Sequence, residues 1–382
     1  MTWVLVQPFG PSGRVAILQS ILEKEGIPYE NIVSDFSHIR KKKFLPEELN
    51  NTISIKTIPY YKNLSIKRLI SHVHFSIKAS QEIRKLSPDY VYCLVPTNSL
   101  IYIASKMYSD AKFVADIYDL WPESFPSKPN FVIKILFFFW KRFREVGIKK
   151  VSYLILESNL YRRYLSVPSD VHCETIYPVA VGNDERPVVV SCKNDITKGI
   201  HFCYLGTINN IVDLDSMQTL FKSISRDRLF SVHFIGKGES KEIFKKIVLR
   251  YGGDFIDHGV IFEEAEKNEV IQQCHFGLNL FSDNTIIGLS LKSIEYLKFG
   301  LPLLSNLDGD TKEYICSGNI GIQYFTGINT SNLVRFYEEN PQIRDNVRSF
   351  YNHTFSKSVI ENQWSSMLQK VTSINNVFEK SL

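Results

Sequence analysis

The stretch "HFCYLG", residues 201–206, decides the fold, because it is an apolar strand that ends in a glycine. The stretch "FSVHFIGKG", residues 230–238, repeats the pattern and ends with two glycines. An amphipathic segment follows each of them, 216–225 after the first and 241–250 after the second. Strand and helix in alternation predict a parallel sheet with helices on both faces. Residues 193–355 are therefore expected to form one doubly wound α/β domain.

The first half of the chain follows the same rhythm. Its expected strands and helices are 3–6, 14–25, 90–95, 100–108, 112–117 and 153–157. We therefore expect two Rossmann-like domains, residues 1–180 and 193–355, joined by a linker at 181–192 that is rich in polar residues and proline. Ligands of such folds bind at the carboxyl ends of the strands, so the two domains should face a cleft. A C-terminal helix within 356–382, with Val359, Trp364, Met367 and Leu368 on its apolar face, should pack back across both.

Length and composition limit the class of protein. A chain of 382 residues is long enough for two domains. Its six cysteines are scattered and include no CxxC pair, which fits a reducing cytoplasm and argues against a disulfide framework or a zinc site. No basic segment precedes the first apolar strand, and no run of about 18 apolar residues occurs, so neither a signal peptide nor a membrane span is expected.

The charge is unevenly distributed. Residues 1–180 contain 24 Lys and Arg against 16 Asp and Glu, whereas the remainder contains 21 against 24. A basic first half predicts an anionic surface or substrate for that half. The segment 131–144, "FVIKILFFFWKRFR", combines aromatic and basic residues and is typical of a helix that lies in a membrane interface. The alternative is a helix buried inside the first domain.

The segment 286–306 predicts a short helix that begins after Ser290 and ends at Gly300. Leu291, Ile294 and Leu297 should face the core. Lys292 stands in the first turn, where the helix dipole disfavours a cation, and Glu295 follows one turn later. Either the two form a solvated ion pair, or both face a polar ligand at the helix N-terminus, which is a ready anion site.

The order of these motifs resembles the GT-B glycosyltransferases of family 4. The shared features are a strand ending in Tyr204-Leu205-Gly206, a later Ile235-Gly236-x-Gly238, and a helix with Glu295 followed by Gly-x-Pro. Two further motifs are similar to a branch that builds bacterial capsule, exopolysaccharide or O-antigen: D-L-W-P-E at 119–123 and S-x-K-x-x-E-Y at 290–296.

The resemblance implies roles for individual residues. Glu295 would hold the donor ribose, and Ser290, Lys292 and the helix N-terminus would hold the diphosphate. Asp119 would face the sugar and, with Lys292 and Glu295, form the catalytic set. The remaining expected residues are Gly206, Thr207, Gly236, Lys237, Gly238, Val260 and Gly288 around the donor, and Gly10, Ser12 and Gly13 on the acceptor side.

The resemblance also implies an activity. It is transfer of a sugar from a UDP- or GDP-sugar to a polyprenyl-diphosphate-linked saccharide, with retained anomeric configuration. Neither a metal, a cofactor nor a nucleic-acid partner is expected. The implied location is cytoplasmic, peripheral on the inner face of the plasma membrane.

Two departures from the family pattern keep alternatives open. Ile287 stands where the wider family has a sugar-binding Glu, and the segment 207–211 lacks the usual cation. The alternatives are a non-catalytic glycosyltransferase-like binding subunit and a nucleotide-sugar epimerase on the same fold. A dinucleotide oxidoreductase is disfavoured, because residues 10–13 lack the third glycine of that fingerprint.

Overall fold

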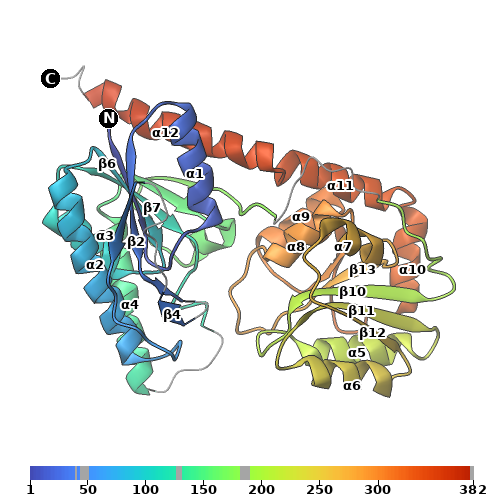
Figure 1. Cartoon of the computed structure of the whole chain (residues 1–382). Helices are drawn as coiled ribbons and strands as arrows, with labels where there is room; N and C mark the ends of the chain where they lie inside the picture. Colours follow the sequence, from blue (N-terminus) through green and yellow to red (C-terminus); the bar gives the residue numbers. More distant parts are fainter. Residues whose placement is uncertain (39–40, 44–50, 126–130, 181–189, 379–382) are drawn as a thin grey trace. The chain divides into compact units, whose positions relative to one another are not determined.

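The computed structural model describes residues 1–38, 41–43, 51–125, 131–180 and 190–378, which form two compact units (Figure 1). The described residues up to Ser124, from 131 to Tyr177 and from Glu361 onward belong to the first unit. Those of Pro178–Ile360 belong to the second. Among the described helices, none is long and apolar enough to span a membrane.

The first unit is built on a parallel sheet in the order β5-β2-β1-β6-β7-β8-β9. Helix α1 lies on one face of this sheet, and α2, α3 and α4 lie on the other (Figure 1). The strands are β1 (Trp3–Gln7), β2 (Tyr29–Ser34), β5 (Thr52–Ile55), β6 (Tyr90–Val95), β7 (Lys112–Ile117), β8 (Tyr153–Leu156) and β9 (His172–Thr175), with β3 (Phe36–Ser37) and β4 (Lys42–Lys43) as a small antiparallel pair. The helices are α1 (Gly13–Lys24), α2 (Ile66–Leu86), α3 (Ser99–Met107) and α4 (Phe131–Ile148), with a 3-10 turn at Asn159–Arg163.

The second unit is built on a parallel sheet in the order β12-β11-β10-β13-β14-β15. Helices α5 and α6 cover one face, and α7, α8 and α9 lie on the opposite side (Figure 1). The strands are β10 (Ile200–Thr207), β11 (Phe230–Lys237), β12 (Asp254–Gly259), β13 (Phe276–Asn279), β14 (Leu303–Ser305) and β15 (Gly321–Gln323). The helices are α5 (Leu214–Ile224), α6 (Lys241–Arg250), α7 (Glu264–Ile271), α8 (Leu291–Lys298), α9 (Asp310–Gly318), α10 (Thr330–Glu339) and α11 (Ile343–Thr354).

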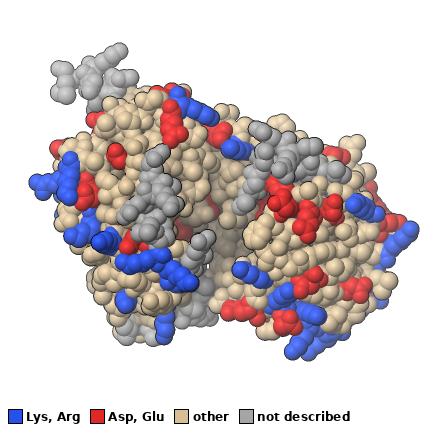
Figure 2. Space-filling model, viewed as in Figure 1, with Lys and Arg blue, Asp and Glu red and all other residues tan. Residues whose placement is uncertain are grey.

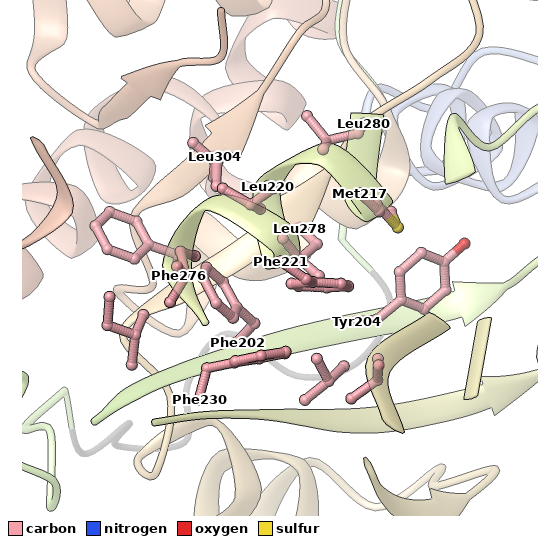
Figure 3. Packing of buried hydrophobic residues seen from close by; sticks show 14 of the residues in the cluster. Phe202, Tyr204, Met217, Leu220, Phe221, Phe230, Phe276, Leu278, Leu280 and Leu304 are labelled. Carbon is pink, nitrogen blue, oxygen red and sulfur yellow. The ribbon is translucent and has the colours of Figure 1, made fainter. Parts of the chain in front are cut away.

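The core of the second unit forms on both faces of its sheet, because β10 and β11 are largely buried and successive side chains of a strand point to opposite faces. Phe202 and Tyr204 of β10 and Phe230 of β11 point to the same side of the sheet, where they meet Leu220 and Phe221 of α5 (Figure 3). All five side chains are buried. Burial of one large apolar side chain stabilises a fold by about 1.5–3 kcal/mol. This face therefore anchors β10 and β11, and with them the ends of both strands.

The structure confirms the two doubly wound halves and the predicted strands. Helix α12 (Lys357–Phe378) confirms the C-terminal helix, and from Glu361 onward its described residues belong to the first unit. Most of the expected linker, 181–189, lies outside the described residues. The cleft, and a helix that packs across both domains, stay predictions. All six cysteines are free, as expected.

Candidate functional site

The strand order of the second sheet reverses between β10 and β13. Such a switch point opens a crevice at the carboxyl ends of the two central strands, because their connections leave in opposite directions. Gly206 lies at this end of β10, and Phe281 follows β13. Helix α8 begins a short loop later. The ligand-binding position of this unit is therefore expected beside Gly206 and the start of α8.

Tyr296 fixes helix α8 on the sheet at the switch point. Its hydroxyl accepts a hydrogen bond from the backbone nitrogen of Leu205 at 2.7 Å and donates to the carbonyl of Cys203 at 3.1 Å. Its ring packs on Gly277, where an added Cβ would lie 2.5 Å from a ring carbon. The tyrosine of the S-x-K-x-x-E-Y motif is thus a structural residue that holds the site in place.

Ser290 is the N-cap of α8, as the sequence predicted. Its Oγ accepts the backbone N–H of Ser293 at 3.1 Å and lies 3.0 Å from Oδ1 of Asn279, to which it donates. Asn279 is itself buried and donates to Ser305 at 2.9 Å. The Ser290 hydroxyl is therefore occupied by the fold. Its role as a direct phosphate ligand stays a prediction, and the helix N-terminus that it caps is the stronger anion-binding feature.

Lys292 lies between two aromatic rings. Its Nζ is 4.2 Å from the ring centre of Phe281 and 4.6 Å from that of Tyr204. Among the described residues no carboxylate pairs with it, and desolvation lowers the pKa of its amine to about 7. An anion beside the ammonium would raise that pKa and stabilise the charged form. The lysine is thus held at the switch point without a counter-ion.

Glu295 forms an ion pair with Lys267 of α7, and both side chains are largely buried. The sequence offered an ion pair between Lys292 and Glu295 as one alternative, and that alternative is wrong. The carboxylate is oriented from a neighbouring helix instead, which no local spacing reveals. Leu291 was expected to face the core but is 47% exposed, because the buried face of α8 is formed by Ser293, Ile294 and Leu297.

The glycines at the carboxyl ends of β10 and β11 are required for different reasons. Gly206 has a φ of +103°, and an added Cβ would meet nothing within 4 Å. Gly236, its partner across the strands, would place a Cβ 2.0 Å from the carbonyl oxygen of Gly206, and Gly238 would do the same to Ile208. Gly236 and Gly238 are therefore required by the neighbouring backbone. Only Gly206 among these three leaves open space for a ligand.

The remaining donor-side residues surround this edge. Thr207 and Lys237 are exposed, and Val260 is 47% exposed. The carbonyl of Gly288 accepts hydrogen bonds from the nitrogen and the hydroxyl of Thr311, at 2.9 and 2.6 Å, which fixes the loop before α8. His258 stacks on His233, with a ring nitrogen of each 3.1 Å apart, and so positions the Gly259-Val260 turn.

In the first unit the strand order reverses between β1 and β6, and Gly10, Ser12 and Gly13 lie at that switch point. The nitrogen of Ser12 donates to the side chain of Gln7 at 2.8 Å. Arg14, in the next helical position, forms a buried two-point ion pair with Asp116 at 2.6 and 3.0 Å. This pair ties the start of α1 to the end of β7.

Asp119 follows β7, and its carboxylate accepts the Ser124 hydroxyl at 2.6 Å. Burial raises its pKa above the ordinary value. The rest of the D-L-W-P-E segment holds the loop in shape: Trp121 is buried, and Glu123 pairs with the buried Arg144 of α4 at 2.6 Å. The turn-capping alternative for Asp119 and its expected role toward a ligand are thus compatible.

Glu157 is a candidate site residue that the sequence reasoning did not single out. It follows β8, next to β7, so it comes to the same sheet edge as Asp119. Burial, with the nearby carboxylates of Asp119 and Asp116, raises its pKa to about 8. An acidic residue directly after the apolar strand "YLIL" was the available signal.

Comparisons of the whole chain with known proteins place the fold. No family model matches, and no curated protein sequence matches. Solved structures do match over nearly the full length. The apo form of the lipopolysaccharide outer core galactosyltransferase WaaB is 16% identical, with 98% of this chain and 99% of that one covered and a TM-score of 0.65. HepE of Anabaena in complex with UDP is 13% identical, with 97% and 100% covered and a TM-score of 0.63. The fold is GT-B.

The same GT-B architecture also occurs in a protein described as a putative UDP-N-acetylglucosamine 2-epimerase from Listeria monocytogenes. It is 13% identical, with 99% of this chain and 97% of that one covered and a TM-score of 0.54. At these identities the similarity establishes the fold alone. Among the described residues, no group of three or more His, Cys, Asp or Glu side chains could hold a metal ion.

Proposed function

We propose that this GT-B protein is a glycosyltransferase of family 4. It transfers a sugar from a UDP- or GDP-sugar to a lipid-linked saccharide during synthesis of a bacterial surface polysaccharide. Transfer retains the anomeric configuration and needs no metal. The protein works in the cytoplasm, on the inner face of the plasma membrane.

The single observation that carries this proposal is Lys292 beside the N-terminus of α8, with no carboxylate partner among the residues that the structure describes. Departure of a nucleoside diphosphate builds negative charge on the leaving phosphates, and a fixed cation with a helix dipole stabilises that charge as it develops. Glu295, oriented by Lys267, supplies an acceptor for the two ribose hydroxyls. Gly206 leaves the space that the nucleotide needs.

The first unit supplies the acceptor side of the proposal. Gly10, Ser12 and Gly13 border the reaction centre, and Asp119 faces the transferred sugar. Its raised pKa makes the Asp119 carboxyl a better proton holder than an exposed carboxylate. In solved complexes of the same fold, HepE is described with UDP and with UDP-glucose, which supports a nucleotide-sugar donor.

Membrane contact through 131–144 is part of the proposal. Phe131, Phe138 and Phe139 of α4 are 76%, 63% and 59% exposed, so the alternative of a helix buried within the domain is wrong for this half of α4. Exposed aromatic rings beside Lys134 and Arg142 suit an anionic interface.

A thermal-shift screen with UDP, GDP, CMP and dTDP tests the donor site. A nucleotide at about 100 times its dissociation constant should stabilise the protein by about 2.7 kcal/mol. The variant Glu295→Ala should lose most of that stabilisation, whereas Glu242→Ala, on the exposed surface of α6, should keep it. No response to any nucleotide, or an equal response of both variants, contradicts the proposal.

A nucleotide-sugar epimerase is the second candidate, supported by the epimerase-like solved structure. It predicts conversion of a UDP-sugar into its epimer without any acceptor. A non-catalytic binding subunit, which Ile287 favours, predicts nucleotide binding with neither conversion nor transfer. Incubation with UDP-sugars, with and without a lipid extract, separates the three outcomes.

A further inference from the structure

An open apolar groove runs between α2 and α4 in the first unit. Its volume is about 510 Å³, within the range of about 300–1,000 Å³ that is usual for ligand sites. Leu69, Val73 and Ile77 line it from α2, and Leu136, Phe139 and Phe143 line it from α4. Helical rise places Ile66 and Ile77, at its two ends on α2, about 16 Å apart. The groove therefore has the length and apolarity of a hydrocarbon-chain site.

The groove continues into a second cavity at the start of α2. This cavity has a volume of about 240 Å³ and is lined by Ser65, the N-cap of α2, and by Trp121. Ile66, Leu69 and Leu136 line both cavities. One end of the groove thus opens at the N-terminus of a 21-residue helix, where backbone N–H groups and the helix dipole favour an anion.

The charged residues around this end of the groove also favour an anion. Residues 58–81 contain Lys62, Lys67, Arg68 and Lys78 and no acidic residue, and the segment 131–144 contains none either. Figure 2 shows Lys and Arg side chains gathered over the lower half of the first unit on the face in view. Glu82 pairs with Lys85 at the far end of α2, and Glu123 pairs with Lys141 and Arg144 of α4, so the excess of positive charge lies around the first turn of α2.

Arg68 is the most informative of these cations. Only 5% of it is exposed, its guanidinium carbon lies 4.7 Å from the ring centre of Trp121, and no carboxylate among the described residues forms an ion pair with it. Its Nε–H donates to Nε2 of His72 at 3.4 Å, so the proton of that imidazole belongs on Nδ1. Nδ1 of His72 and Nε1 of Trp121 are both buried without a partner. The Arg68 guanidinium also donates to the carbonyl of Asn63 at 2.9 Å, and Asp119 acts on its charge from nearby without forming an ion pair. Its positive charge is thus only partly balanced within the fold, and an anion at the adjoining N-terminus of α2 would complement it.

We propose that the groove between α2 and α4 binds the hydrocarbon chain of a lipid phosphate or diphosphate, with the phosphate at the N-terminus of α2. This inference rests on the proposed lipid-linked acceptor and names where that acceptor is held. A flat membrane contact needs only exposed apolar side chains. The groove instead binds one chain outside a bilayer, and it selects an anionic head.

Dodecyl phosphate, used below the concentration at which it forms micelles, tests the proposal. Trp121 and Trp140 line the two cavities, so tryptophan fluorescence reports binding. We expect saturable binding of dodecyl phosphate, at least tenfold weaker binding of dodecyl maltoside, and no response to inorganic phosphate at the same concentrations. Equal affinity for the two dodecyl compounds, or a response to phosphate alone, overturns the proposal.

Phe138 and Phe139 provide a matched pair of variants. Both are about equally exposed, but only Phe139 lines the groove. Phe139→Ser should weaken dodecyl phosphate binding at least fivefold, and Phe138→Ser less than twofold. Val73→Phe, which fills the groove, should also weaken binding, and Lys67→Gln should weaken dodecyl phosphate more than dodecyl maltoside. Equal losses in Phe138→Ser and Phe139→Ser mean surface contact alone and contradict the groove.

Nucleotide stabilisation, measured on the same samples, keeps the two proposals apart. It reports on the second unit, and an unchanged melting temperature without ligand shows that each variant is folded. A wild-type protein that responds to a nucleotide but never to dodecyl phosphate refutes the groove and leaves the donor site standing. The reverse result refutes the proposed glycosyltransferase and leaves the lipid site.

Discussion

The hydroxyl of Tyr296 lies 2.7 Å from the backbone nitrogen of Leu205, across the point where β10 and β13 diverge. Both residues are buried, and the neighbouring Gly206 begins the open edge of the sheet. One hydrogen bond thus ties the helix that carries Lys292 and Glu295 to the strand end that leaves room for a ligand.

Tyr296→Phe should therefore affect both stability and binding. The change removes the hydroxyl that accepts the buried N–H of Leu205, and a buried donor left unsatisfied costs about 1–3 kcal/mol. Urea unfolding should show a loss of that size, and nucleotide affinity should fall because Gly206 and α8 are no longer held together. Tyr337→Phe is the control, since the Tyr337 hydroxyl donates to the carbonyl of His275, which precedes β13 at the end of the sheet away from Gly206. An equal loss of nucleotide affinity in both variants would rule out this account of Tyr296.

Gly206→Ala and Gly236→Ala should distinguish a glycine that leaves space for a ligand from a glycine that the fold requires. Alanine at Gly236 would put a Cβ 2.0 Å from the Gly206 carbonyl oxygen. Neither strand can move far enough to relieve this clash without breaking the pairing between β10 and β11. We expect a loss of about 3 kcal/mol or more there, from overpacking together with backbone strain. At Gly206 the methyl meets nothing, so only the strain of its positive φ remains, while nucleotide affinity falls by at least tenfold. A Gly206→Ala protein that binds nucleotide as wild type does would remove Gly206 from the site.

The pH dependence of nucleotide binding should report Lys292. Its pKa in the free protein is about 7, and a bound diphosphate raises it, so binding takes up a proton above that pH. Affinity should therefore fall as the pH rises from about 7 to about 9, by up to about tenfold per pH unit. Terminal phosphates lose their last proton near pH 6, below this window.

Calorimetric titrations in two buffers of different ionisation enthalpy measure the proton uptake. Lys292→Met should bind more weakly and show no slope in this window. Lys237→Met, which removes an exposed cation at the same sheet edge, should keep the slope. A slope that persists in Lys292→Met assigns the proton to another group.

The sequence predicted the sheets because their strands are short apolar runs such as 90–95 and 230–235, which are fully buried in the structure. The bounds of helix α2 are harder to predict from the sequence, for a physical reason. Its buried face carries Ser71, His72, Ser76 and Ser80, so the apolar stripe that marks an amphipathic helix is broken by polar residues. The groove between α2 and α4 could not be predicted either, because it depends on how two helices far apart in the sequence pack together.

The candidate site was predictable only in part. Ser290 as N-cap follows from local chemistry, and the structure confirms it. The partner of Glu295 is Lys267, 28 positions away, and the rings around Lys292 come from two other segments. Such contacts depend on how strands order themselves in the sheet, which local sequence does not encode. The glycine at position 236 is likewise required by the backbone of the neighbouring strand and not by a ligand.

The most direct test of the central claim is a double-mutant cycle between Glu295 and the ribose. The dissociation constants of UDP and 2′-deoxy-UDP are measured on the wild type and on Glu295→Gln, or those of the guanine pair if the screen selects GDP. If Glu295 holds the ribose diol beside the α8 phosphate site, the substitution weakens UDP at least tenfold and changes 2′-deoxy-UDP by much less. Equal weakening of both ligands, or of neither, would contradict the assignment of α8 as the nucleotide-diphosphate site.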